Sequence, residues 1–428
     1  MTAAGDRRFE RKRARVFAVL FTAYVMVYFH RFAPGAVSQD LKKAFDLTAA
    51  SLGSLAAMYF YIYAVMQIPS GVLADSLGPR KTVVAGNFLA GMGSILFGLA
   101  PTLAVASAGR LLVGLGVSVV FVAVMKSNAM WFSEARYARM GGLTLLVGNL
   151  GSVLAVAPLA FLVGILSWRA VFVTLGAFSI LLAWVGWRTV RDRPEHCGFQ
   201  AVVDSPDGNS GTTWREIRRG LFEVGSHRTT WAIFLMNFGI TGGLYAFMGL
   251  WGVRLLSDAH GMTDGRASGF VTVMLFAFAF GCVFFGWLSD RLRLRKAVML
   301  VGNIVYLLFW CLFWWWMPSE GPVLYPLMAA LGFLGGASTL GFATSKESNP
   351  PRFSGMAVAV VNMGTFVGVS VMQPLYGWLL DLLWRGKLSE GVRIYGGESY
   401  QDATLLMVGF ALLAVLATFF MRETRCRM

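Results

Sequence analysis

The stretch GVLADSLGPRK at residues 71–81 is repeated in outline by GWLSDRLRLRK at residues 286–296, about 215 residues further on. In both copies a glycine is followed four residues later by an aspartate, and then by a cluster of basic residues. Each copy lies between two apolar runs that are long enough to form membrane-spanning helices. A duplicated stretch of this kind predicts a chain built from two related halves.

The composition independently indicates a membrane protein. The chain is 57% hydrophobic and 14% charged, with a mean hydropathy of +0.63. That is more apolar side chain than a soluble domain could cover, so we expect an all-α polytopic membrane protein. Twelve windows of about 20 apolar residues are expected to span the membrane: 16–37, 51–73, 82–100, 103–126, 141–165, 169–188, 229–253, 268–288, 297–317, 323–345, 355–380 and 402–421.

Six windows fall in each half of the chain. We therefore predict an N-terminal six-helix bundle at residues 1–190 and a C-terminal six-helix bundle at residues 229–428. Residues 191–228 between them are rich in Arg, Gly, Ser, Asp and Pro, which is typical of a linker.

The distribution of basic residues predicts the orientation. With the N-terminus inside, about 26 of the 37 Lys and Arg residues lie in cytoplasmic segments, as the positive-inside rule requires. Both termini are then cytoplasmic, and the cytoplasmic (inner) membrane of a bacterium is the expected location. The pI near 10.0 reflects this topology and an attraction to membrane lipid, so nucleic acid is not expected as a partner. The four cysteines have no metal-ligand spacing, and no metal or cofactor is expected.

Polar residues inside the predicted spans are candidates for a binding site, because each one is costly unless it faces a cavity or a partner. Tyr24, Tyr28 and Arg31 share one face of the first span, and His30 lies next to that face. Arg31 is about 24 Å of helix beyond Arg15, which places it in the central to outer part of the membrane. An anchor at the outer interface is the alternative role for Arg31.

Two other spans repeat this spacing. The residues concerned are Tyr59, Tyr63 and Gln67 in the second span, and Asn237, Thr241 and Tyr245 in the seventh. We expect these stripes to line a water-filled cavity. Tyrosines of the membrane interface and amides that join helices would produce the same pattern.

Lys126 and Lys346 occupy equivalent positions at the cytoplasmic ends of the fourth and tenth spans. They either serve an anion or snorkel to the headgroups, and Lys346 has adjacent Glu347 as a further partner. No Asp or Glu is placed deep within a span. A cavity with arginine and no carboxylate attracts anions and repels cations.

The duplicated loops resemble those between helices 2 and 3 and between helices 8 and 9 of major facilitator superfamily transporters, and the resemblance covers essentially the whole chain. It implies two six-helix bundles that rock about a central site to give alternating access. The loops would form a cytoplasmic latch in which Asp75 pairs with Arg80, Lys81 or the amino end of a neighbouring helix. Arg110, with Gly114 and Gly116, is similar to the Arg-x-x-x-Gly-x-Gly pattern of the fourth helix. The residues expected to act in gating are Gly71, Asp75, Arg80, Lys81, Gly286, Asp290, Arg291 and Arg110.

Within the superfamily, YFYIYAVMQIPSG at residues 59–71 and NPP at residues 349–351, followed by Gly355, are similar to the organic-anion and sugar-phosphate permeases. In the glycerol-phosphate type, one arginine from the first helix and one from the seventh clamp the phosphate. Arg31 suits the first role, but Asn237 stands where the second arginine would fall. A symmetric clamp of two arginines is therefore not expected.

Residues 148–158, GNLGSVLAVAP, resemble the nitrate/nitrite porter signature, and NMG at residues 362–364 is a weaker copy. That family binds its anion with an arginine eight residues ahead of each loop aspartate. Gln67 and Cys282 occupy those places here, so nitrate is not the expected substrate. The glycines are expected to provide backbone flexibility and close helix packing.

The sequence therefore predicts a secondary transporter for a small organic anion, with no enzymatic chemistry, and the resemblance to the superfamily implies a monomer as the working form. The coupling ion, whether a proton, sodium or a counter-anion, is left open. One alternative is a proton-coupled exporter of amphiphilic or drug-like compounds, although no buried carboxylate is expected that could carry the proton. The other alternative is a transporter-like ligand sensor. The candidate substrate-binding residues are Arg31, Tyr28, Tyr59, Tyr63, Gln67, Asn149, Asn237, Tyr245 and Asn362. The candidates for a further anion contact or for coupling are His30, Lys126, Lys346 and Glu347.

Overall fold

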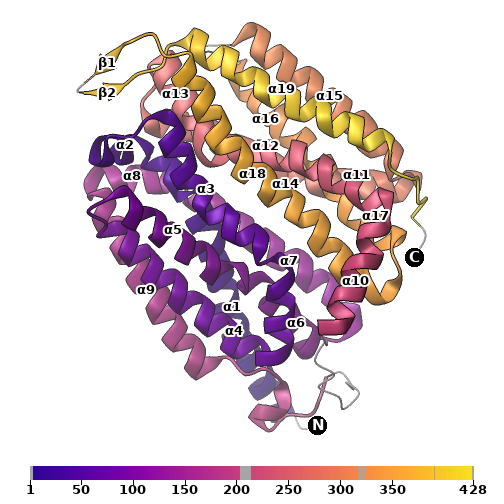
Figure 1. Ribbon diagram of the computed structural model, residues 1–428. Coiled ribbons are helices and arrows are strands. Elements are labelled where there is room, and N and C mark those ends of the chain that lie inside the picture. The colour runs from indigo at the N-terminus through magenta and orange to yellow at the C-terminus, as the bar shows by residue number, and fades with distance from the viewer. Residues whose placement is uncertain (1–2, 203–213, 318–320, 322, 390, 427–428) are drawn as a thin grey trace. The chain divides into compact units, whose positions relative to one another are not determined.

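The computed structural model describes residues 3–202, 214–317, 321, 323–389 and 391–426, and it is almost entirely helical (Figure 1). The helices of the first half are α1 (Ala3–Ala36), α2 (Ser38–Phe45), α3 (Ala49–Val65), α4 (Gln67–Gly98), α5 (Leu103–Ser118), α6 (Val120–Trp131), α7 (Glu134–Leu154), α8 (Ala157–Ile165) and α9 (Trp168–Thr189). After α9 come a 3₁₀ turn, η1 (Pro194–Cys197), and the helix α10 (Trp214–Ser226).

The second half begins with one long helical segment made of α11 (Arg228–Asn237), η2 (Phe238–Gly242), α12 (Gly243–Ala246), η3 (Phe247–Trp251) and α13 (Gly252–His260). It continues with α14 (Asp264–Leu292), α15 (Lys296–Trp316), α16 (Leu324–Gly335), η4 (Gly336–Thr339), α17 (Leu340–Ser348), η5 (Pro351–Phe353), α18 (Ser354–Leu382) and α19 (Gly397–Phe419). The short strands β1 (Leu388–Ser389) and β2 (Val392–Arg393) form an antiparallel hairpin before α19.

All twelve predicted windows lie on these helices, which confirms the fold class. Among the described residues, nine helical segments are long and apolar enough to cross a membrane. A tenth arises if α2 and α3, which meet at a bend of 116°, count as one span. The third window lies in the second part of α4, beyond the non-helical Gly78, and the fifth is divided between α7 and α8.

The backbone turns sharply inside the first duplicated loop. Gly78 has φ of 80°, a left-handed conformation that glycine adopts without the steric cost of a Cβ atom, and Pro79 follows it. The chain therefore ends one helix before Gly78 and starts another immediately after it.

By its contacts the chain divides into two compact units. Unit 1 comprises Met1–Arg31, Val65–Leu154 and Leu166–Trp214, and unit 2 comprises Phe32–Ala64, Ala155–Ile165 and Arg215–Met428. Bundle boundaries at residues 190 and 228 stay a prediction. The predicted linker carries ordered structure in its described part, because η1 and α10 lie within it and Glu223 of α10 pairs with Arg352.

Small residues set the helix packing in unit 1. A Cβ atom on Gly86 of α4 would lie 2.5 Å from the carbonyl oxygen of Gly116 on α5, so the two backbones touch there. This contact explains the glycine at position 116 in the pattern after Arg110. Close approach through small residues is the usual way that membrane helices associate.

Candidate functional site

The first helix places three predicted site residues together in unit 1. The guanidinium of Arg31 lies 4.6 Å from the ring centre of Tyr28, and the hydroxyls of Tyr24 and Tyr28 are 3.5 Å apart. Arg31 is 4% exposed, so its charge is withdrawn from solvent within the protein. The helical face predicted from the sequence thus carries a buried guanidinium stacked on an aromatic ring.

His30, on the neighbouring face, makes contacts inside unit 1. Its Nε2 lies 3.3 Å from Ser179 Oγ on α9, and its backbone carbonyl accepts a hydrogen bond from Arg110 Nη1 at 3.0 Å. Arg110 is 1% exposed. In this structure Arg110 therefore binds the backbone of the first helix one residue before Arg31, which is a positioning contact.

Residues 148–154 of the nitrate-porter-like segment lie in α7 and pack on the same part of α1. A Cβ atom on Gly148 would lie 2.8 Å from the ring of Tyr28, and Gly151 faces the backbone of Val25. Asn149 donates from Nδ2 to the carbonyl of Leu145 in its own helix at 3.0 Å. The close packing expected of these glycines is present.

In unit 2, Tyr59 and Tyr63 of α3 stack with their ring centres 5.7 Å apart, and Tyr63 contacts Phe366 of α18 at 4.3 Å. Both tyrosines are buried. The third member of the predicted stripe, Gln67, does not continue α3, because α3 ends at Val65 and Gln67 begins α4.

The predicted stripe of the seventh span is buried but is not a regular α-helical face. Two π-helical turns, η2 and η3, interrupt the segment and change the spacing of the side chains around it. Asn237 donates to the carbonyl of Val361, the residue before Asn362, at 3.1 Å, and Thr241 lies 2.8 Å from Ser338 Oγ. Tyr245 packs between Phe32 and Phe278 at 5.7 and 5.9 Å.

The first gate loop forms an ion pair that the sequence analysis did not predict. Asp75 pairs with Lys126 Nζ of α6 at 2.8 Å, and this ammonium also donates to the carbonyl of Ala74 at 3.0 Å. The predicted partner Arg80 is directed elsewhere after the turn at Gly78, because its guanidinium donates to the carbonyl of Trp187 at 2.6 Å. A pair of Asp75 with Arg80, Lys81 or the amino end of a neighbouring helix when the inner gate is shut therefore stays a prediction. In this structure Lys126 thus contacts the loop at Ala74 and Asp75, and its two predicted roles, an anion contact or a position among the headgroups, stay predictions.

The second gate loop has a related arrangement in unit 2. Arg295 Nη1 donates to Asp290 at 2.7 Å, and its Nη2 lies 3.1 Å from Glu347 of α17. Glu347 also accepts from Thr424. Glu347 thus pairs with Arg295, whereas the sequence analysis considered a pair with the exposed Lys346.

The four remaining predicted gate residues lie in α4 and α14, where Gly71 and Gly286 are half-buried. Lys81 is exposed, and exposed Arg291 lies over the ring of Trp287 at 5.4 Å. Nothing lies within 4 Å of a Cβ atom built on Gly71 or Gly286, so packing in this structure does not require glycine at either position.

Each duplicated loop donates a backbone N–H to a carboxylate that is distant in sequence. One carboxylate follows the sixth predicted span and the other follows the twelfth. Asp192 accepts from the backbone N–H of Arg80 at 2.7 Å, and Glu423 accepts from the backbone N–H of Arg295 at 2.7 Å. Burial raises the pKa of Glu423, but hydrogen bonds from the backbone N–H groups of Arg295, Arg425, Ala297 and Lys296 outweigh it, and the net pKa lies below its ordinary value.

A buried charged cluster in unit 2 was missed by the sequence analysis. Asp258, 5% exposed in the last turn of α13, lies 3.3 Å from Arg254 and 3.6 Å from Lys42 of α2. Its carboxylate also accepts from Tyr400 at 2.7 Å and from Gln39 at 3.0 Å. The i, i+4 spacing of Arg254 and Asp258 was the available signal, but the partners from α2 and α19 are distant in sequence.

The neighbouring loop residue Tyr395 belongs to the same region of unit 2. Its hydroxyl donates to Asp381 at 2.5 Å, and Lys42 Nζ lies 5.0 Å from its ring centre. Burial raises the pKa of Tyr395, and so does the hydrogen bond to the Asp381 carboxylate. The phenol therefore stays a hydrogen-bond donor at physiological pH.

Comparison with known proteins gives a consistent family signal. The profile of the Major Facilitator Superfamily matches residues 20–256 and 233–426. The chain is 25% identical over 319 residues to a probable sulfoacetate transporter of Cupriavidus necator, covering 69% of this chain and 71% of the relative. It is 24% identical over 415 residues to the glycerol-3-phosphate transporter of Bacillus subtilis, covering 89% of each.

The solved structures show the same fold. A bacterial homolog of the human lysosomal transporter Spinster, in an inward-facing and unoccupied conformation, superposes with a TM-score of 0.73 at 18% identity. The match covers 96% of this chain and 97% of that one.

Proposed function

The chain belongs to the Major Facilitator Superfamily, and from this premise we propose that it moves a small organic anion, such as a carboxylate or a phosphate ester, by alternating access. It is a membrane transporter and not an enzyme. We place it in the cytoplasmic membrane of a bacterium with both termini inside, since most of its basic residues lie in the segments that this topology leaves in the cytoplasm.

One observation carries the choice of an anion. Arg31, 4% exposed on a membrane helix, has its guanidinium stacked on Tyr28 in unit 1. A planar guanidinium offers two parallel donors to a carboxylate or phosphate, and it stays charged when it is withdrawn from water. The names of the two relatives, a sulfoacetate and a glycerol-3-phosphate transporter, are in keeping with an anionic substrate.

The other candidate ligands would shape specificity. We assign hydrogen bonding to Tyr28, Gln67 and Asn362, and an aromatic wall to Tyr59, Tyr63 and Tyr245. Asn149 and Asn237 make their recorded bonds to backbone carbonyls, so they position their helices in this structure and would have to change partner to reach a substrate.

The ion pairs of the two gate loops would form the inner latch. The Asp75–Lys126 pair and the Arg295 cluster each join two helices near the turn of a loop. We infer that they form and break as the inner side closes and opens. The buried Lys42–Asp258–Arg254 cluster is our candidate for the outer latch, because breaking a buried pair is costly, about 3–5 kcal/mol, and would hold a closed state.

The test is transport by purified protein in liposomes. Vesicles preloaded with one unlabelled anion are assayed for uptake of radiolabelled glycerol 3-phosphate, sulfoacetate and hexonates, with imposed proton, sodium and counter-anion gradients to find the coupling ion. We expect saturable uptake of at least one organic anion and no uptake of neutral sugars.

Substitutions of Arg31 make the test specific. Arg31→Lys keeps the charge and loses the two-donor plane, and Arg31→Ala loses both. A charge-assisted hydrogen bond contributes about 1.5–3 kcal/mol, so the alanine variant should bind the anion about tenfold to a hundredfold more weakly, with lysine intermediate. The matched control is Arg188→Ala, since exposed Arg188 also stacks on an aromatic ring, that of Trp184, at 4.9 Å.

The outcomes separate the three functions considered. Unchanged anion affinity in a folded Arg31→Ala protein would contradict the proposed role of Arg31. Proton-driven movement of neutral amphiphiles without any anion flux would identify an exporter. Ligand binding without flux would identify a sensor.

A further inference from the structure

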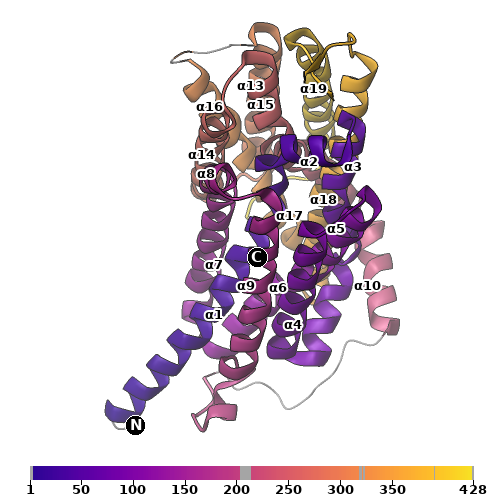
Figure 2. The same ribbon diagram turned by 90° about the vertical axis from the view of Figure 1, so that its left-hand side faces the viewer.

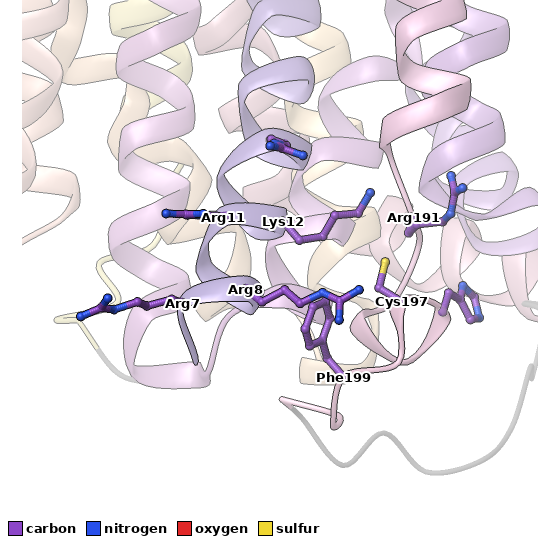
Figure 3. Close-up of a pocket in the computed structure, with 9 residues that line it drawn as sticks. Arg7, Arg8, Arg11, Lys12, Arg191, Cys197 and Phe199 are labelled. Atoms are coloured by element: carbon purple, nitrogen blue, oxygen red, sulfur yellow. The ribbon is translucent and has the colours of Figure 1, made fainter. Parts of the chain in front are cut away.

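A cavity of about 880 Å³ in unit 1 is lined almost wholly by basic side chains (Figure 3). It lies between the N-terminal turns of α1 and the segment after α9, which Figure 2 shows at the same end of unit 1. Its cationic lining residues are Arg7, Arg8, Arg11, Lys12, Arg15 and Arg191. No carboxylate is among its described lining residues.

Aromatic packing holds the two walls of this basic cavity together. Phe9 of α1 meets Phe199 edge-on with ring centres 5.2 Å apart and stacks on Trp131 of α6 at 6.1 Å. The indole of Trp131 in turn donates to the carbonyl of Arg191 at 3.1 Å. Lys12 bridges from α1 to the carbonyl of Thr189 at 3.1 Å. The walls therefore have a defined spacing and are not two independent loops.

The charges of the cavity are not neutralised by the described part of the protein. Among the side chains that the structure describes, no ion pair with a carboxylate is recorded for Arg8, Arg11 or Arg15. The nearby Glu10 binds Arg13 instead, and Asp192 binds the backbone of Arg80. Like charges three and four residues apart on one helix repel each other, so these arginines raise the local potential and attract an anion.

We propose that the basic cavity binds a phosphate-bearing anion through Arg8, Arg11 and Arg15 of α1, with Lys12 on the same wall and Arg191 on the opposite wall completing the site. Guanidinium groups suit phosphate because each offers two donors in one plane. A volume of about 880 Å³ is in the range of sites for molecules larger than orthophosphate. Two sources have the required chemistry: an anionic phospholipid headgroup, or a soluble polyphosphate.

This site is separate from the proposed transport site. Arg31 lies sixteen positions beyond Arg15, which is about 24 Å along α1. The proposal therefore does not depend on Arg31 and stands even if the transported substrate is not an anion.

The experiment measures binding to full-length protein in an uncharged detergent at low salt. Sodium tripolyphosphate is the soluble probe, and dioctanoyl phosphatidylglycerol is the lipid probe, with dioctanoyl phosphatidylcholine as its zwitterionic control. The test variant is R8Q/R11Q/R15Q. The matched control is R215Q/R218Q/R219Q, which removes three exposed arginines from α10, outside the cavity.

Cys197 provides a local reporter, because it also lines the cavity (Figure 3). In a protein in which Cys282, Cys311 and Cys426 are replaced by alanine, bound probe should slow the alkylation of Cys197 by a neutral maleimide. This measurement uses the unmodified arginines, so it remains informative if the triple variant does not fold.

We expect one phosphate probe to bind and to protect Cys197, and the test variant to lose at least about tenfold in affinity while the control changes little. Binding of phosphatidylglycerol alone assigns the site to lipid, and binding of tripolyphosphate assigns it to a soluble anion. Absence of binding by both probes, equal losses in the two triple variants, or binding without protection of Cys197 would overturn the proposal.

Discussion

At the scale of single residues, the gate loop of unit 1 depends on a pair between side chains that are both partly solvated. Asp75 and Lys126 are 2.8 Å apart, with side-chain exposures of 51% and 23%. Such a pair contributes little to folding, typically about 0.2–1 kcal/mol. If the pair forms in only one of the open and closed states, the same free energy changes the ratio of the two states by up to about fivefold.

We predict that Asp75→Asn and Lys126→Met each lower the initial rate of uptake at matched amounts of protein, with little change in melting temperature. The double variant should be no slower than the slower single variant, because both changes remove one interaction. Uptake in liposomes and thermal unfolding in detergent provide the two measurements.

Glu223→Gln is the control, since it breaks an ion pair of the same length, 2.8 Å, between α10 and Arg352, neither of which belongs to a gate loop. Normal uptake in both Asp75→Asn and Lys126→Met, or an equal loss in Glu223→Gln, would show that the Asp75–Lys126 pair does not gate.

At the scale of elements, both duplicated loops start their next helix with help from a distant carboxylate. Glu423 accepts from the backbone N–H groups of Arg295 and Ala297, at 2.7 and 3.1 Å, at the beginning of α15. The first N–H groups of a helix have no partner within it, and the helix dipole favours a negative charge there. Asp192 acts in the same way on Arg80.

The depressed pKa of Glu423 predicts a pH dependence of stability. Its folded-state pKa lies below the ordinary value of 4.5, so its charge stabilises the folded protein above pH 4.5. That contribution is lost as the pH falls through the folded-state pKa. Glu423→Gln should therefore melt at a lower temperature than the parent at pH 7, and the two melting temperatures should converge as the pH falls through the folded-state pKa of Glu423.

Glu10→Gln is the comparison for this measurement, because the recorded bonds of Glu10 are to the side chain of Arg13. Its melting temperature should stay close to that of the parent at pH 7. A difference between Glu423→Gln and the parent that is the same at every pH would contradict a role for the charge.

At the scale of the whole molecule, the proposed membrane topology rests on the distribution of basic residues. The structure adds two positions that report it cleanly. Gly396, before α19, is exposed and has ordinary negative φ, with nothing within 4 Å of an added Cβ atom. Cys197 lies in η1, on the segment after α9.

We predict that a cysteine at position 396, in a protein without its four native cysteines, reacts with an impermeant maleimide added to intact cells. Native Cys197 should react only after the membrane is permeabilised. Labelling of Cys197 in intact cells and protection of position 396 would invert the proposed topology.

The sequence by itself determined the class of the molecule. Apolar runs, the duplicated loop and the bias of Lys and Arg are properties of the chain read in order, and water, lipid and the insertion machinery act on them segment by segment. For this reason the twelve helical windows, the family and the exclusion of enzymatic chemistry could be predicted without coordinates. The face of α1 that carries Tyr24, Tyr28 and Arg31 was equally predictable, because 3.6-residue periodicity is local.

The tertiary structure decided which partner each polar group takes. Asp75 binds Lys126, 51 residues away, instead of neighbouring Arg80. Asp258 contacts Lys42, 216 residues before it, and Tyr400, 142 residues after it. The π-helical turns at η2 and η3 likewise changed a face that had been predicted from α-helical spacing. Pairing energies fall off within a few ångströms, so they depend on how helices pack and turn, and packing is a property of the folded chain as a whole.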